Sequence, residues 1–276
     1  MTPVRQEFIS TLRLRNYSPK TIKQYTNCVS QFARYFKQCP SQLGPKEVKS
    51  YLLYLIEEKQ CSWSHYRQTV CGLRFLYTKV IGHEWMAEHI PFPRRTQRLP
   101  EFLTPEEVRL VFNAVQNPKH LMMLETIYAT GVRCSELVNL KVKDIDSKRK
   151  VVIVRNGKGA KDRLTLLDHI LLEKLRVYFR QYQPSEWLFE GRQGHVSTSV
   201  PQKACQRAER DSGIGKRVTP HILRHSFATA LLEQNVDLVT ISNLLGHSRI
   251  KTTELYTHIT LKKLQNTRSP LELLDE

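Results

Sequence analysis

A short stretch of the sequence places a histidine and an arginine at the start of an expected helix, where an anion would bind. Thr219 is expected to cap this helix and Pro220 to occupy its first position. His221 and Arg224 are three residues apart, so both lie on one face in the first turns. A helix N-terminus carries free N–H groups and a partial positive charge. The stretch is therefore suited to holding a phosphate group.

Metal binding is the alternative for this stretch, because His221 and His225 are four residues apart. The metalloprotease pattern with that spacing requires Glu directly after the first histidine, and this chain has Ile222 there. We therefore favour phosphate and expect neither a metal nor another cofactor. His225 is expected to lie off the face that His221 shares with Arg224 and to have a structural role.

A second histidine and a tyrosine follow the expected end of another helix. Gly246 is placed to end that helix, which leaves His247 just outside it and free to point into a site. Tyr256 stands nine residues later. A lone tyrosine is more often a packing residue than a reactive one, so its role depends on the groups around it.

The first 90 residues have the pattern of a small helical bundle, which we predict to be one domain. Ser18 and Pro19 are typical of a helix start, and a second helix is expected to begin at Pro45. A third is expected over residues 63–80, and the opening segment supplies another. Apolar residues recur every three or four positions in the helix after Pro19, namely Ile22, Tyr25, Val29, Phe32 and Phe36.

Residues 91–103 differ from both flanks, with three prolines and three arginines, Arg94, Arg95 and Arg98. This composition predicts an extended, semi-rigid basic linker. Such a linker would either follow a DNA backbone or simply connect two domains, and composition alone does not separate these roles.

Residues 104–276 are predicted to form a second domain, which a capping box from Thr104 to Glu107 opens. Two β-rich runs at residues 151–154 and 163–167 flank a Gly-rich segment, which is typical of a β-hairpin. The rest is mostly helical in pattern. The expected fold class is mainly α with a small β-hairpin or sheet in the second domain.

The composition of the 276-residue chain excludes several protein classes. Hydrophobic residues make up 40 % and charged residues 25 %, which is enough apolar material for a folded core. No window approaches 18 uncharged apolar residues and the N-terminus has no signal pattern, so we expect neither a membrane span nor secretion. The six scattered cysteines lack a CxxC pair, as is typical of reduced thiols in the cytoplasm.

The net charge of +17 points to nucleic acid as the partner, because neutralising phosphates releases counterions. A generally basic surface without such a partner is the alternative. Residues 1–99 carry 16 basic and 6 acidic side chains, and the remainder carries 27 and 20. The basic excess therefore belongs to both halves, as expected for a protein that holds DNA from two sides.

Four stretches taken together resemble the tyrosine recombinase (phage integrase) family, most closely its compact Xer-like members. They occur in the family's order, at residues 129–137, at residues 157–163, at His221 with Arg224, and from residue 245 to Tyr256. Residues 14–25 also resemble that family's core-binding domain. The resemblance implies a C-shaped, two-domain DNA clamp that cleaves and rejoins DNA at specific sites.

The resemblance implies a role for each reactive residue. Tyr256 would attack the phosphodiester and form a 3′-phosphotyrosyl enzyme, which conserves the bond energy without ATP or metal. Arg133 and Arg224 would hold the non-bridging oxygens, because a guanidinium matches phosphate with two parallel hydrogen bonds. Lys158 would protonate the leaving 5′-oxygen.

The remaining site residues would support this chemistry. His221 would act as a general base or donate a hydrogen bond to the phosphate, and His247 would donate another. Glu136 would orient Arg133, three residues before it. Lys161 and Arg163 are alternatives to Lys158 as the general acid, because all three flank or occupy the hairpin tip.

Further basic residues are expected to hold the duplex, namely Lys20, Lys23, Arg67, Arg74, Arg94, Arg95, Arg98 and Lys161. The resemblance implies a homo-tetramer on double-stranded DNA, with a C-terminal tail that docks on a neighbouring protomer and a Holliday junction as intermediate. A partner recombinase is possible. We expect a cytoplasmic, nucleoid-associated protein.

Two other functions remain open on sequence alone. A type IB topoisomerase-like enzyme uses similar strand-cleavage chemistry, and a non-catalytic DNA-binding regulator would need only the basic surface. The choice among integration, excision, cassette exchange and chromosome dimer resolution also stays open.

Overall fold

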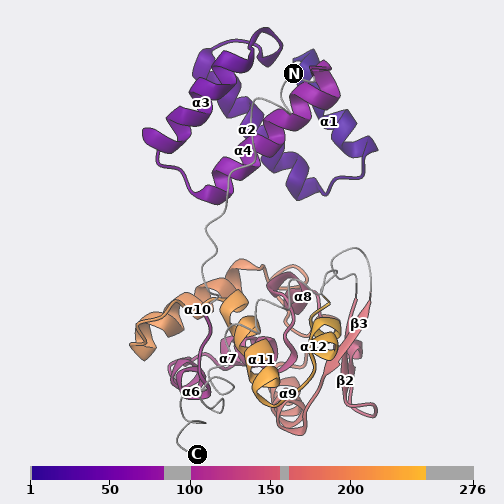
Figure 1. The fold of residues 1–276 in the computed structure, drawn as a ribbon. Coiled ribbons are helices and arrows are strands. Elements are labelled where there is room, and N and C mark those ends of the chain that lie inside the picture. Colours follow the sequence, from indigo (N-terminus) through magenta and orange to yellow (C-terminus); the bar gives the residue numbers. More distant parts are fainter. Residues whose placement is uncertain (1, 84–100, 156–161, 247–276) are drawn as a thin grey trace, which may run out of the picture. The chain divides into compact units, whose positions relative to one another are not determined.

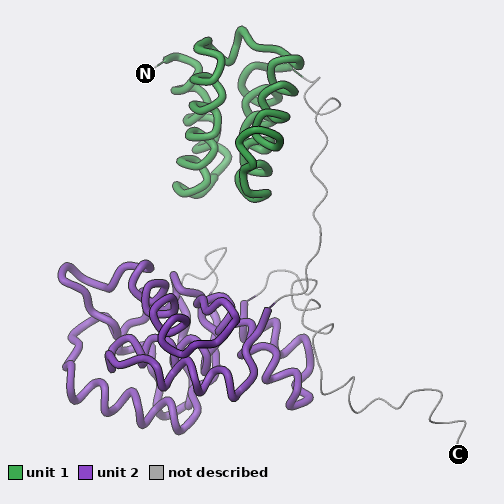
Figure 2. Tube along the Cα trace, turned by 90° about the vertical axis from the view of Figure 1, so that its left-hand side faces the viewer, with its two compact units in different colours: residues 1–97 green, residues 98–276 purple. Residues whose placement is uncertain are grey.

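The chain forms two compact units, Met1–Gln97 and Arg98–Glu276 (Figure 2). The computed structural model describes residues 2–83, 101–155 and 162–246. Most of the expected linker, the expected hairpin tip and the C-terminal tail lie outside these residues. No helix in the described ranges is long and apolar enough to cross a membrane.

The first unit is the small helical bundle that the sequence predicts. The side chain of Ser18 accepts a hydrogen bond from the backbone N–H of Thr21 at 3.2 Å, so the cap forms where it was expected. A short π-helical turn, Tyr77–Ile81, continues the last helix. The helices are α1 (Pro3–Leu14), α2 (Pro19–Phe36), α3 (Pro45–Glu57) and α4 (Trp63–Leu76) (Figure 1).

An aromatic core holds the first unit together. Phe8 of α1 meets Phe75 of α4 edge to face, with ring centroids 5.7 Å apart. Phe32 of α2 packs on Tyr51 of α3 at 5.2 Å. All four side chains are buried, so one residue from each helix enters the same core. The predicted apolar stripe of α2 faces this core.

The second unit consists mainly of helices and also has a small antiparallel sheet with the strand order β1–β2–β3. The strands are β1 (Ile145–Asp146), β2 (Val151–Val154) and β3 (Arg163–Leu166), and Val154 pairs with Arg163. The predicted hairpin strands are confirmed, while β1 is too short to give a sequence pattern. The helices are α6 (Pro105–Asn113), α7 (Pro118–Thr130), α8 (Cys134–Val138), α9 (His169–Tyr182), α10 (Ser199–Ser212), α11 (Pro220–Glu233) and α12 (Leu238–Leu245).

Helix α7 lies at the centre of the second unit, where it contacts α9, α10 and α11 (Figure 1). Its side chains Met123, Leu124 and Ile127 are completely buried. Helices that are apolar on most sides belong in a core rather than on a surface. The end of α7 is therefore held firmly, and it leads directly to Arg133.

Gly131 makes this end of α7 possible. It caps the helix with φ +63°, a left-handed conformation that L side chains rarely adopt. A Cβ at this position would lie 2.4 Å from Cδ1 of Phe227 in α11 and 2.9 Å from Cδ2 of Leu245 in α12. The absence of a side chain thus lets three helices meet beside the arginine.

Gly131→Ala is expected to destabilise the protein more than Gly213→Ala. Gly213 also has a positive φ, +68°, but a Cβ there meets nothing within 4 Å. Both variants carry the left-handed backbone cost of about 1–2 kcal/mol, and only Gly131→Ala adds an overpacking cost of about 1–3 kcal/mol. Urea unfolding followed by circular dichroism measures both, and equal losses of stability would contradict the close approach of the three helices.

Candidate active site

Three arginines from different parts of the second unit surround one buried carboxylate, that of Glu136 in α8. Arg133 donates to it twice at 2.7 Å, once from Nη1 and once from its backbone N–H. Arg163, the first residue of β3, donates to both oxygens, at 2.9 and 2.7 Å. Nη1 of Arg224 in α11 lies 3.8 Å from Oε2.

The same three guanidinium groups also meet the end of α12. Nε of Arg163 donates to the carbonyl of Leu244 at 2.8 Å. Nη2 of Arg224 donates to Leu245 O at 2.7 Å, and Nη2 of Arg133 donates to Gly246 O at 3.0 Å. The last carbonyls of a helix lack intrahelical partners and carry partial negative charge, so these contacts are favourable.

The charges of this cluster do not cancel. Burial by itself raises the pKa of the Glu136 carboxyl, but hydrogen bonds and charge from Arg163 and Arg133 outweigh burial and lower that pKa to about 2. The cluster therefore holds three permanent cations and one anion near neutral pH, a net charge of two. Arg133 is the most accessible of the three, with a side chain 26 % exposed. An incoming anion would meet Arg133 first.

His221 lies at the start of α11, beside the arginines. The Oγ1 atom of Thr219 accepts a hydrogen bond from the Ile222 N–H at 3.1 Å, so the predicted cap is present. Burial lowers the pKa of the His221 imidazole, and the charges of Arg224 and Arg133 lower it further. The ring is therefore neutral at pH 7 and has a lone pair that can accept a proton.

The predicted position of His225, off the face that His221 shares with Arg224, is wrong. Its Nε2 lies 2.9 Å from Nε2 of His221, and the ring centroids are 4.1 Å apart. Residues four apart in a helix share a face, so His225 belongs to the same side as His221. One ring must donate its Nε2 proton to the other, which couples their tautomers. The described ranges contain no group of three His, Cys, Asp or Glu residues arranged to hold a metal.

The structure brings together Arg133, Glu136, His221 and Arg224 of the predicted site. Sequence reasoning placed Arg163 only among the alternative general acids, whereas its side chain is 9 % exposed and bound to Glu136. The other predicted reactive residues lie outside the described residues, namely Lys158, Lys161, His247 and Tyr256.

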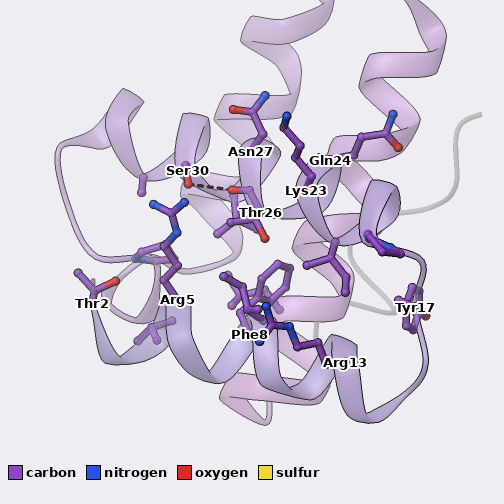
Figure 3. Close-up of a pocket in the computed structure, with 18 of the residues that line it drawn as sticks. Thr2, Arg5, Phe8, Arg13, Tyr17, Lys23, Gln24, Thr26, Asn27 and Ser30 are labelled. Atoms are coloured by element: carbon purple, nitrogen blue, oxygen red, sulfur yellow. Dashed lines mark hydrogen bonds between the residues drawn. The ribbon is translucent and has the colours of Figure 1, made fainter. Parts of the chain in front are cut away.

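The predicted DNA-holding residues of the first unit lie on two helices. Lys20 and Lys23 belong to α2, and Arg67 and Arg74 to α4. Lys20 and Lys23 line an open pocket between α1 and α2, and Figure 3 shows Lys23 there with basic residues of α1. The guanidinium of Arg67 lies 5.4 Å from the Trp63 ring centroid. The predicted linker arginines Arg94, Arg95 and Arg98 lie outside the described ranges.

Both units match known protein families. Residues 101–263 match the phage integrase family, and residues 4–87 match the phage integrase N-terminal SAM-like domain. A putative integrase/recombinase, y4qK, of Sinorhizobium fredii is 43 % identical over 99 % of this chain and 90 % of its own. Tyrosine recombinase XerA of Thermococcus onnurineus is 34 % identical over 99 % of this chain and 96 % of its own.

Solved structures show the same fold. A crystal structure of XerA recombinase has a TM-score of 0.56 at 27 % identity, and the match covers 96 % of this chain and 99 % of that one. A lambda integrase dimer bound to a core site has a TM-score of 0.78 at 18 % identity, with 97 % and 98 % covered. The likeness in sequence and in fold spans both units. The chain is thus a member of the phage integrase family, the tyrosine recombinases that cleave and rejoin DNA at specific sites.

Proposed function

We propose that this recombinase binds the scissile phosphate between Arg133 and Arg224 and cleaves it with Tyr256. The observation that supports this most strongly is the cluster of three guanidinium groups around the single carboxylate of Glu136. A phosphodiester carries one negative charge and gains a second as the nucleophile adds. The net charge of two in the cluster matches that transition state, which is where electrostatic stabilisation contributes most to rate.

The chemistry balances without a cofactor. The phenolate oxygen of Tyr256 attacks phosphorus, the bond to the 5′-oxygen breaks, and Lys158 gives that oxygen its proton. The products are a 3′-phosphotyrosyl enzyme and a free 5′-hydroxyl, and the reverse attack rejoins a strand. His221 accepts the phenol proton or donates a hydrogen bond to the phosphate, and its neutral form suits the first role. His247 donates a hydrogen bond to a phosphate oxygen.

The remaining basic residues would hold the duplex. Chains of this fold, among them XerH and lambda integrase, are bound to DNA in their solved structures. We propose that the two units of this chain form a C-shaped clamp on duplex DNA. Four copies would assemble over two crossover sites and pass through a Holliday junction, alone or with a partner recombinase.

The nucleophile is tested with Tyr256→Phe. The DNA site is first recovered by trapping the covalent complex and sequencing its DNA, and is then made with a nick so that the cleaved strand end is lost. In excess EDTA we expect the unaltered protein to form a covalent adduct on denaturing gels and Tyr256→Phe to form none. No adduct with the unaltered protein, or an adduct with the variant, would reject the assignment. Plasmid relaxation by a monomer would instead indicate a topoisomerase.

Arg133→Lys is expected to slow single-turnover cleavage by about 10²–10³-fold, the cost of losing one donor to a developing oxyanion. A lysine keeps the charge but cannot donate to Glu136 and Gly246 O as Nη1 and Nη2 do while also making a forked contact with the phosphate. DNA binding in a gel-shift assay is expected to change little, because many other cations hold the duplex. Added salt should weaken that binding steeply without restoring cleavage to the variant. Near-normal cleavage by Arg133→Lys would contradict the proposed role.

The pH dependence of cleavage is expected to report His221. Its lowered pKa keeps the imidazole neutral to more acidic pH than an ordinary histidine. Cleavage should therefore fall only as the pH drops below about 6.5, when the ring becomes protonated and loses its basic lone pair. His221→Gln should be slower and should lack this decline. Single-turnover rates measured across the acidic and neutral range check this, and an unchanged profile in the variant would contradict it.

A further inference from the structure

Arg163 is a buried guanidinium whose hydrogen bonds all point into the protein in the described contacts. Its two terminal nitrogens donate to the two oxygens of Glu136, and its Nε donates to Leu244 O. Its Cδ occupies the space beside Gly246, where a Cβ would lie only 2.7 Å away. The side chain is 9 % exposed. Arg163 is therefore placed to act on its neighbours and not on the DNA.

The forked contact with Arg163 settles the orientation of the Glu136 carboxylate. A guanidinium that donates to both oxygens of a carboxylate holds the two groups in one plane. Glu136 is also the partner of Arg133, through Nη1 at 2.7 Å. The direction in which Arg133 presents its remaining N–H groups thus depends on a carboxylate that Arg163 holds.

Arg163 also sets the charge that the site can offer to a phosphate. With it, the carboxylate is shared among three cations, and Arg224 stays 3.8 Å from Oε2. Without it, two cations would share one anion, and the net charge of the cluster would fall from two to one. A freed carboxylate oxygen would then be open to closer pairing with Arg133 or Arg224, in competition with the phosphate.

We propose that Arg163 is a positioning residue for strand cleavage, which acts through Glu136 to orient Arg133 and to keep its charge available. This inference rests on the proposed function of Arg133. The same side chain joins β3, which follows Lys158 in the sequence, to the end of α12, which precedes His247. Its contact with Glu136 adds α8, which follows Arg133, so one guanidinium ties together the elements next to three proposed reactive residues, Lys158, His247 and Arg133.

The test compares Arg163→Lys with the unaltered protein on two substrates. Lysine keeps the charge but has no fork, so cleavage of the natural phosphate is expected to fall roughly 10- to 100-fold, as for other outer partners of functional groups. The second substrate carries a methylphosphonate at the cleaved position, in which a methyl group replaces one charged oxygen. This neutral group develops less negative charge during cleavage and so depends less on stabilisation by Arg133. On this substrate the rate loss of Arg163→Lys is expected to shrink to less than about threefold, and the rate loss of Arg133→Lys is expected to shrink as well.

Arg155→Lys is the matched control. Arg155 follows β2 on the same hairpin and pairs at 2.7 Å with Asp144, a carboxylate that makes no described contact with Glu136 or its three arginines. The cleavage rate of Arg155→Lys is expected to equal that of the unaltered protein on both substrates. Thermal unfolding of the two lysine variants separates a folding defect from a catalytic one.

Glu136→Gln supplies an independent variant should Arg163→Lys fold poorly. It keeps the shape but replaces one accepting oxygen with an NH2 group, so the four hydrogen bonds from Arg133 and Arg163 cannot all form. Arg133 then loses its orientation, and the variant should show the same selective rescue by methylphosphonate. In the double variant the two losses should not add, because both act through one carboxylate. Additive losses, equal losses on both substrates, or full activity of Arg163→Lys would overturn the inference. Failure of the unaltered protein to form any adduct would instead reject the proposed function.

Discussion

The sharing of one buried carboxylate by three guanidinium groups is the interaction on which the second unit of this protein depends. Glu136 is the anion that allows Arg133, Arg163 and Arg224 to lie together in the interior. A buried charge is costly unless it is paired and hydrogen-bonded, and every described contact of Glu136 meets that condition. One carboxylate neutralises only one of the three guanidinium charges. The remaining positive charge is the property that a phosphate-cleaving enzyme needs.

Local signals made much of the fold predictable. Helix starts at Ser18 and Thr219 carry a side-chain oxygen and a following proline, and Gly131 and Gly246 end helices in the left-handed conformation. These effects depend only on a few residues that are adjacent in sequence, so they can be predicted without knowledge of tertiary contacts. The resemblance of four short motifs then indicated that Arg133, Glu136, His221 and Arg224 belong to one site, and the structure does bring them together.

The features of the fold that could not be predicted from the sequence depend on tertiary contacts that oppose local patterns. In β3 an alternating pattern favours Leu164 and Leu166 as the buried residues, yet Leu164 is 55 % exposed and Thr165 is 1 % exposed. The inverted pattern exists because Arg163 and Thr165 share the inner face, where they bind Glu136 and the carbonyl of Thr130. A polar inner face is favourable only when such partners are present, and those partners lie far away in sequence.

Three consecutive carbonyls at the end of α12, those of Leu244, Leu245 and Gly246, each accept a different arginine. This arrangement fixes the end of α12 at three points. Because these arginines belong to β3, to α11 and to the residue just before α8, the end of α12 is held against three elements at once, and both its position along the helix axis and its rotation about that axis are fixed.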